Sequence, residues 1–201
     1  MSGLSRVSRR SLPVLMLFSL AACAGGTAMM APNQPAPIAV PDQARIIFLR
    51  PEAPGATAVS ASVFDVSGAE SKFIGFVNTG QKVGYSVAPG DYSFMVVSEA
   101  ADFLKATVVA GRTYYVLVTP RIGMWRARFS LRPVRHGELA GSEFASWDSG
   151  TEFAATTPAA EEWARRNAQS IKTKRDRYWP EWTGKPAEQR ASQTLDAADG
   201  R

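Results

Sequence analysis

The stretch VAPGDYSFMVVS, residues 87–98, decides the fold class of this 201-residue chain. Its Pro-Gly pair at residues 89–90 is a turn signal, because proline presets φ at the second position and glycine supplies the positive φ that a type II turn needs at the third. After this turn, Tyr92, Phe94 and Val96 share one face of an extended segment, as on a strand that covers a core. The stretch therefore predicts a turn followed by a β-strand.

Short apolar runs separated by turn residues, at intervals of about ten, extend over residues 44–134. This pattern predicts a mainly β fold, an antiparallel β-sandwich of about seven to eight short strands within a domain over residues 44–139. In residues 112–119 both faces are apolar, which predicts a central strand covered on both sides. The expected strands are Ala44–Arg50, Val59–Val66, Lys72–Asn78, Lys82–Val87, Asp91–Ser98, Leu104–Val109, Arg112–Thr119 and Arg126–Val134.

The pattern becomes helical after residue 141, and a C-terminal α-helical appendage is expected over residues 140–184. Thr157 supplies a hydroxyl N-cap, and proline is favoured at the next, first helical position. The helix is expected to end near Tyr178, because Pro180 cannot continue it. Its apolar stripe is thin, so the helix needs a partner surface. Residues 185–201 are expected to be disordered.

Four aromatic residues of this helical segment, Trp163, Tyr178, Trp179 and Trp182, are candidate partner contacts. Aromatic rings in a polar segment stack on sugars or insert into a partner's groove. The alternative is that they dock the helix on the β-domain. Neither interpretation makes them an active site.

The N-terminus has the order of a secretory signal: three arginines, a short apolar run and small residues. The apolar run is too short to cross about 30 Å of hydrocarbon. Leu20-Ala21-Ala22-Cys23 resembles the lipobox of bacterial lipoproteins. The resemblance implies that residues 1–22 are a lipoprotein signal peptide and that Cys23 is acylated as the new N-terminus. The alternatives are cleavage at another small residue, with a buried thiol, and export by the twin-arginine route.

Residues 23–43 are rich in proline and alanine and carry one charge, a composition that predicts a tether. Loss of residues 1–22 lowers the formal net charge from +5 to +2, because that segment holds three arginines and no acidic residue. A nearly neutral protein offers no bulk attraction for nucleic acid. The expected partners are a membrane, through the lipid on Cys23, and an envelope protein or peptidoglycan.

Four segments carry a further resemblance: residues 44–51, 73–75, 87–94 and 110–116. Together they resemble a family of small bacterial lipoprotein β-domains of unknown function and, more loosely, the PEGA-type surface-layer modules. The resemblance covers about residues 44–139 and implies a β-domain in the cell envelope. It implies no catalytic residue, because the matching motifs are turn signals.

Candidate catalytic chemistry is sparse. His136 is the only histidine, and no Gly-x-Ser-x-Gly motif accompanies it, so a surface histidine is expected rather than a catalytic one. With one histidine, and with Cys23 expected to carry lipid, neither a metal site nor a cofactor is predicted. Acidic residues such as Asp65 and Asp91 are expected at turns rather than as a glycosidase pair.

Arg126, Arg128 and Arg132 form a candidate anion-binding row, in a stretch without acidic residues between Asp102 and Glu138. Strand alternation points these arginines outward, with successive outward positions about 6.8 Å apart. Such a row suits the phosphates of lipid or lipopolysaccharide or the carboxylates of peptidoglycan. The alternative is a solvated strand face that protects a sheet edge and pairs with the acidic residues from Glu138 onward.

The features together predict a non-catalytic envelope lipoprotein, a binding or structural module at the bacterial outer membrane facing the periplasm. Ala24, rather than aspartate, follows Cys23, which the enterobacterial sorting rule associates with the outer membrane. The alternative is an envelope hydrolase acting on a cell-wall or lipid substrate. A pocket that holds His136 beside a serine and a carboxylate would favour the hydrolase.

Overall fold

The computed structural model describes residues 29–38, 40–52, 59–121 and 128–201. In these ranges the strands are β1 (Met30–Ala31), β2 (Ala44–Arg50), β3 (Ala61–Asp65), β4 (Lys72–Val77), β5 (Gln81–Val87), β6 (Gly90–Val97), β7 (Ala101–Val108), β8 (Thr113–Arg121), β9 (Arg128–Pro133), β10 (Glu152–Phe153), β11 (Ala155–Thr156) and β12 (Thr194–Leu195). The helices are α1 (Ser142–Ser149), α2 (Pro158–Thr183) and α3 (Ala187–Ala191), with the 3-10 turns η2 (His136–Glu138) and η3 (Ala197–Asp199).

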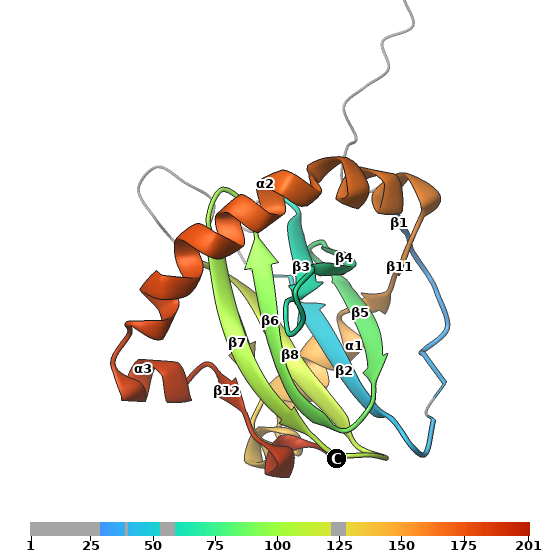
Figure 1. Cartoon of the computed structure of the whole chain (residues 1–201). Helices are drawn as coiled ribbons and strands as arrows, with labels where there is room; N and C mark the ends of the chain where they lie inside the picture. Colours follow the sequence, from blue (N-terminus) through green and yellow to red (C-terminus); the bar gives the residue numbers. More distant parts are fainter. Residues whose placement is uncertain (1–28, 39, 53–58, 122–127) are drawn as a thin grey trace, which may run out of the picture.

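Within the described ranges, the eight longer strands β2 to β9, with the two-residue strands β10 and β12, form two five-stranded sheets that enclose a shared apolar core (Figure 1). The first sheet has the order β10-β5-β2-β8-β9 and the second has the order β12-β7-β6-β3-β4. Strands β1 and β11 pair separately. The ring of Phe48 in β2 meets the ring of Phe94 in β6 edge to face, with centroids 5.2 Å apart, at the centre of this core. The mainly β fold with a C-terminal helix is therefore confirmed.

All eight expected strands are present as β2 to β9, each within three residues of the predicted ends. The expectation of a purely antiparallel sandwich of seven to eight strands was wrong. Strand β2 runs parallel to β8, and the short strands β10 and β12 run parallel to β5 and β7. These two short strands add to the count and cover the edges of β5 and β7.

The turns explain why the sheets are mixed. The turns at residues 78–80, 88–89 and 109–112 each lead from a strand of one sheet to a strand of the other, so they do not close hairpins. Gly80 and Gly111 have φ values of +73° and +75°, in the left-handed region that favours glycine. Because the chain changes sheets at these turns, β2 and β8 become parallel neighbours, although 62 residues separate the end of β2 from the start of β8.

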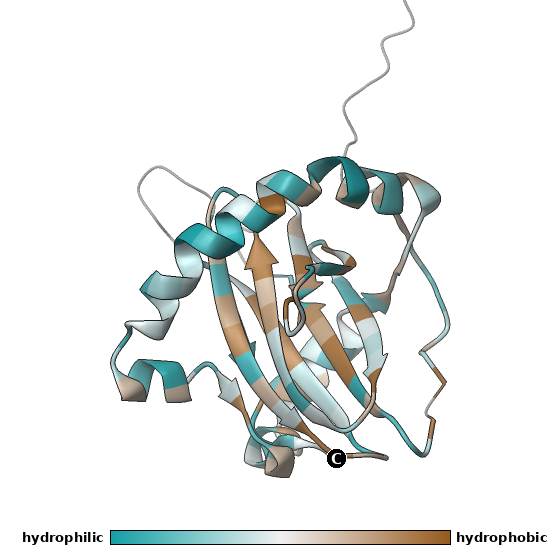
Figure 2. Cartoon of the chain, viewed as in Figure 1, coloured by the Kyte–Doolittle hydropathy of each residue, from teal (hydrophilic) through white to brown (hydrophobic). Residues whose placement is uncertain are grey.

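Both sheets are also apolar on their outer faces. On the second sheet, Phe64, Met95 and Phe103 point away from the central core and lie beneath α2. On the first sheet, Tyr115 packs on Phe144 of α1 with ring centroids 4.8 Å apart. Strand β8 is thus covered on both sides, as predicted. Figure 2 shows apolar strands beneath a largely hydrophilic α2.

Helix α2 begins as predicted but ends later. The Thr157 hydroxyl accepts a hydrogen bond from the Ala160 N–H at 3.4 Å and donates one to the Met29 carbonyl at 3.0 Å. The predicted stop at Pro180 was wrong, because the helix continues to residue 183. Trp182, beyond the proline, is buried against the second sheet. Its burial helps offset the roughly 3 kcal/mol that an interior proline costs a helix.

None of the helices in the described ranges is long and apolar enough to cross a membrane.

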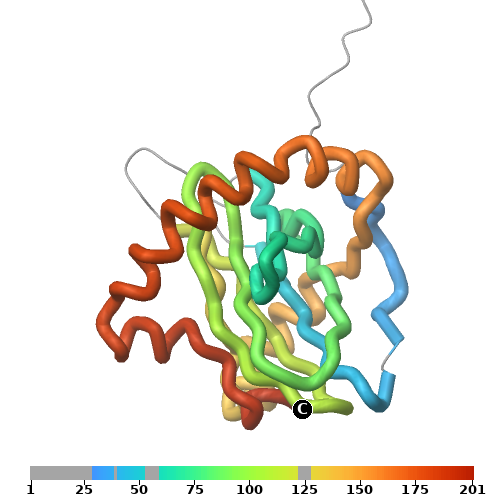
Figure 3. The backbone as a smooth tube through the Cα atoms, viewed as in Figure 1, coloured from blue at the N-terminus to red at the C-terminus, as the bar shows by residue number. Residues whose placement is uncertain are grey.

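The C-terminal segment is ordered, so the expected disorder of residues 185–201 was wrong. Strand β12 pairs with β7, and Leu195 is fully buried in the core between the sheets. The backbone of Arg201 exchanges two hydrogen bonds with Thr113 at 2.8 and 3.0 Å. Figure 3 shows this segment returning along the sheets. The polar composition of this segment predicted disorder. The segment is ordered by backbone hydrogen bonds and by one buried leucine, and neither changes its composition noticeably.

Part of the predicted tether also belongs to the fold. Met30 is buried in the central core and pairs with Thr156 of β11. The Pro37 ring lies so close to the backbone of Gly84 that no side chain would fit at residue 84, so the two segments are in close contact. The tether prediction was therefore wrong for residues 29–38, while residues 23–28 lie outside the described residues. The domain extends beyond the predicted 44–139 at both ends.

Replacing Leu195 by alanine tests whether the C-terminal segment is part of the core. Leu195→Ala should lower the free energy of unfolding by about 2–5 kcal/mol, because it leaves a cavity in the central core. The control Ile38→Ala, at a side chain that is 86% exposed, should change it by less than about 0.5 kcal/mol. Urea unfolding followed by tryptophan fluorescence measures both, and equal stabilities of the two variants would contradict the burial of Leu195.

Candidate functional site

The structure places two members of the arginine row on the outer face of the edge strand β9. Phe129 and Leu131 face the central core, as predicted, and Arg128 and Arg132 alternate with them. Arg126 lies outside the described residues. Arg132 donates to the Glu138 carboxylate at 2.8 Å and lies over the Trp147 ring at 5.3 Å. Arg132 is therefore already paired, as the alternative interpretation expected.

Glu138 is held in its charged form by the same contacts. Burial acts to raise the pKa of Glu138, but hydrogen bonds from the Arg135 backbone N–H and the Arg132 guanidinium outweigh it, and the pKa lies below its ordinary value. Arg135 in turn binds Asp199 at 2.8 Å and the carbonyl of Thr194 at 2.7 Å. Arg135 thus fastens the C-terminal segment beside β9, and Arg132 is paired with Glu138, so the two arginines do not form part of a continuous free cationic row.

The four aromatic candidates pack on the chain's own second sheet. The Trp163 ring lies 4.8 Å from Phe76, and the Trp179 ring lies 5.0 Å from Phe103. Trp182 is buried, and its indole N–H donates to the Gln193 side chain at 3.0 Å. Tyr178 packs against the same cluster. Within the chain, these four side chains therefore dock α2 on the β-domain, which was the alternative interpretation.

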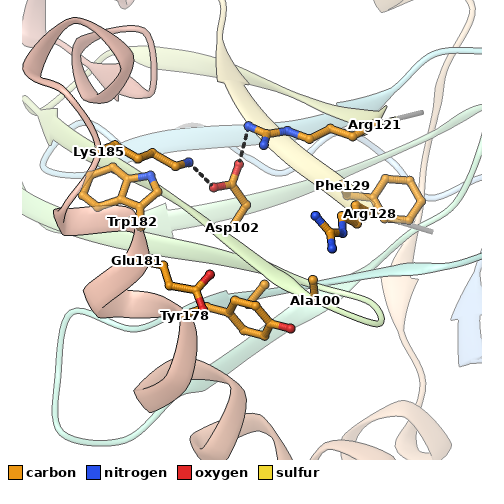
Figure 4. A pocket seen from close by; sticks show the side chains of 10 residues that line it. Ala100, Asp102, Arg121, Arg128, Phe129, Tyr178, Glu181, Trp182 and Lys185 are labelled. Atoms are coloured by element: carbon orange, nitrogen blue, oxygen red, sulfur yellow. Dashed lines mark hydrogen bonds and ion pairs between the residues drawn. The ribbon is translucent and has the colours of Figure 1, made fainter. Parts of the chain in front are cut away.

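A polar cleft of about 150 Å³ gathers residues from both predicted groups (Figure 4). Arg128, Tyr178 and Trp182 line it, together with Glu181. The buried carboxylate of Asp102 lies at its centre, between cationic side chains from β8 and from the segment after α2.

The Asp102 cluster consists of Asp102, Arg121, Lys185 and Gln193. One Asp102 oxygen accepts from Lys185 at 2.8 Å, and the other accepts from Arg121 at 3.2 Å and from Gln193 at 2.5 Å. The Gln193 amide oxygen also accepts from Lys185, at 2.8 Å. Every oxygen at the centre of the cluster is engaged, so the cluster binds the C-terminal segment to β7 rather than offering a free acid or base.

Sequence reasoning missed the Asp102 cluster. Lys185 and Gln193 lie 83 and 91 residues from Asp102, so no local spacing relates them. The available signal was an acidic residue directly before the apolar pair Phe103-Leu104, where burial requires a partner for the charge.

Arg128, at the rim of the cleft, makes no ion pair with any other described residue.

His136 is exposed in η2. Its backbone N–H donates to Asp199 at 3.3 Å, while its imidazole makes no hydrogen bond to a serine or carboxylate in the described part of the chain. In that same part, no group of three or more histidine, cysteine, aspartate or glutamate side chains is placed to hold a metal ion. Cys23 lies outside the described residues.

A larger cavity, about 490 Å³, lies beneath the C-terminal half of α2. We call it the α2 groove and define it by Ser93, Lys105, Lys172, Arg175 and Trp179. Of these five residues, only Trp179 was a candidate from the sequence. The sequence did not group them, because they come from three separate elements, β6, β7 and α2.

The sequence matches no known protein-family model, and a search of curated proteins found no relative.

The role of the Asp102 cluster can be tested by comparing its buried and exposed members. Asp102→Ala should lower the free energy of unfolding by about 3 kcal/mol, because it leaves Lys185 without its carboxylate in a largely buried site. Arg121→Ala should cost less than about 1 kcal/mol, because the Arg121 side chain is half exposed. Denaturant unfolding of both variants measures the difference, and a cost for Asp102→Ala no larger than that for Arg121→Ala would contradict this role.

Proposed function

We propose that this protein is a non-catalytic lipoprotein of the bacterial cell envelope, acylated at Cys23, whose β-domain acts as a binding or structural module at the outer membrane. The observation that carries the proposal is Leu20-Ala21-Ala22-Cys23, directly after a basic start and a short apolar run. Acylation also accounts for Cys23, because the sequence has no second cysteine with which it could form a disulfide within the chain. The resemblance of residues 44–139 to lipoprotein β-domains agrees with this proposal.

The start of the fold also supports an anchor at Cys23. The carbonyl of Met29 accepts hydrogen bonds from the Thr157 N–H at 3.1 Å and from the Thr157 hydroxyl at 3.0 Å, and Met30 is buried. Six residues along a chain span at most about 21 Å. A lipid on Cys23 would therefore hold the β1–β11 end of the domain close to the membrane surface.

This short connection favours a defined orientation. The N-terminus of α2 lies next to β1, while the turn after β7 lies at the opposite end of the sheets (Figure 1). The first end would face the membrane and the second would face the periplasm. The location at the outer membrane rests on Ala24, the residue after the acylated cysteine.

Replacing Cys23 by serine tests the anchor. Cys23→Ser should abolish acylation and block processing by the lipoprotein signal peptidase, because serine lacks the sulfur that receives the lipid. Mass spectrometry of the N-terminal peptide and membrane fractionation measure both effects. A variant that is cleaved normally and retained in the membrane would overturn the assignment.

Thiol labels test the orientation. In the acylated protein the sulfur of Cys23 carries lipid, so Ala159→Cys and Ala110→Cys each introduce the only free thiol; both positions are exposed. A fluorophore at residue 159, next to the anchored end, should be quenched more strongly by nitroxide-labelled lipid headgroups than one at residue 110. Equal quenching in reconstituted vesicles would contradict the proposed orientation.

A further inference from the structure

The floor of the α2 groove is a cross-strand pair on the outer face of the second sheet. Ser93 of β6 lies directly opposite Lys105 of β7. Their neighbours Phe94 and Leu104 belong to the core between the sheets, so Ser93 and Lys105 face α2. The wall of the groove is formed by side chains of α2, including Trp179.

The groove is cationic. Its described lining residues include Lys105, Lys172 and Arg175 but only one acidic residue, Asp176. The ion pair of Lys172 with Asp176, at 2.5 Å, joins two exposed side chains and is therefore worth little. An anion that enters the groove meets a net positive charge.

The charges of Arg175 and Lys105 face neutral groups. The Arg175 guanidinium donates to the carbonyls of Gly68 and Ala69 at 2.9 and 3.1 Å, which fixes its position without neutralising it. The Lys105 ammonium lies 5.1 Å from the centroid of the Trp179 ring and forms no ion pair with a described carboxylate. Both cations are thus held in place with their charge still available to a ligand.

Ser93 adds a neutral hydrogen-bond donor to the groove. The residue is 7% exposed, and its hydroxyl has no hydrogen-bond partner among the described residues and remains open to the groove. The nearby Ser67 hydroxyl is already engaged, because it accepts from the Ser93 N–H and donates to Asp65. A ligand oxygen in the groove would accept a hydrogen bond from this hydroxyl in place of water.

A largely apolar cavity lies beside the groove. It has a volume of about 430 Å³ and shares Ala69 and Lys172 with the groove. Its other lining residues are Phe64, Ala164, Ala168 and Ile171, with the polar residues Glu70, Ser71 and Gln169. Cationic and apolar cavities side by side suit a molecule with a charged head and a hydrocarbon chain. Each cavity is within the size range of small-ligand sites.

We propose that the α2 groove binds the phosphate of an anionic lipid through Lys105, Lys172, Arg175 and the Ser93 hydroxyl, with an acyl chain of that lipid in the adjacent apolar cavity. The proposal rests on the proposed function, because a membrane-anchored protein meets such lipids. Trp179 packs against the head-group region, beside Lys105.

The test uses the mature protein, as the cell processes it, in neutral detergent. The probes are the soluble short-chain lipids dihexanoyl phosphatidylglycerol and dihexanoyl phosphatidylcholine, and inorganic phosphate; binding is followed by native mass spectrometry and tryptophan fluorescence. The anionic lipid should bind more tightly than the zwitterionic lipid, and the difference should shrink as salt rises. It should also bind more tightly than phosphate, because only the lipid fills the apolar cavity.

A pair of variants tests the site itself. Lys105→Gln with Lys172→Gln should weaken binding of the anionic lipid about tenfold or more, because two charged donors are lost. The control, Arg165→Gln with Arg166→Gln, removes the same charge from exposed positions of α2 outside the groove and should change binding less than about twofold. All four substituted side chains are exposed, so both variants should fold.

Three results would overturn the proposal: equal binding of the two lipids, phosphate binding as tight as the anionic lipid, or an equal loss in both variants. Because binding is measured in detergent, this result is independent of membrane anchoring. If the anionic lipid does not bind as expected but Cys23→Ser loses acylation, the lipid site is rejected and the anchor is supported. If the lipid binds as expected but Cys23→Ser is processed and retained in the membrane normally, the anchor is rejected and the lipid site is supported.

Discussion

Trp179 and Trp182 pack against Phe103, and the outer layer of the molecule depends on this contact between α2 and the second sheet. Phe103 faces away from the core between the sheets, so without α2 it would lie in water. Covering it requires the helix to continue past Pro180, which carries the chain to the point where Lys185 reaches Asp102. The C-terminal segment can then return along β7 and end beside Thr113.

Local features of the structure were predictable, because they depend on neighbouring residues. Alternation located strands β2 to β9, and Thr157 with the following proline located the start of α2. The crossings between sheets depend on which faces pack together, which alternation does not encode. Leu195 shows the same limit, because its burial depends on β7, about 90 residues earlier. Composition alone therefore made an ordered segment resemble a disordered one.

The candidate sites show where single-strand reasoning ends. Alternation placed Arg128 and Arg132 correctly on the outer face of β9, but the partner of Arg132 comes from η2, which the strand pattern does not include. The α2 groove combines a serine of β6, a lysine of β7 and two cations of α2. A serine, a lysine or an arginine is not unusual at any of these positions taken alone. The residues form a groove only because α2 crosses β6 and β7 where these side chains lie.

The two-residue strands β10 and β12 have a consequence for self-association. Strands at a sheet edge expose unpaired N–H and C=O groups, which invite another copy to add its own strand and begin aggregation. Here β10 covers β5 and β12 covers β7, while Pro133 removes one donor from the edge strand β9. If Cys23 anchors the protein as proposed, its copies would share one membrane surface and would collide in similar orientations. The short strands would then remove β5 and β7 as places where such molecules could join edge to edge, which leaves β4 and β9 as the longer edge strands.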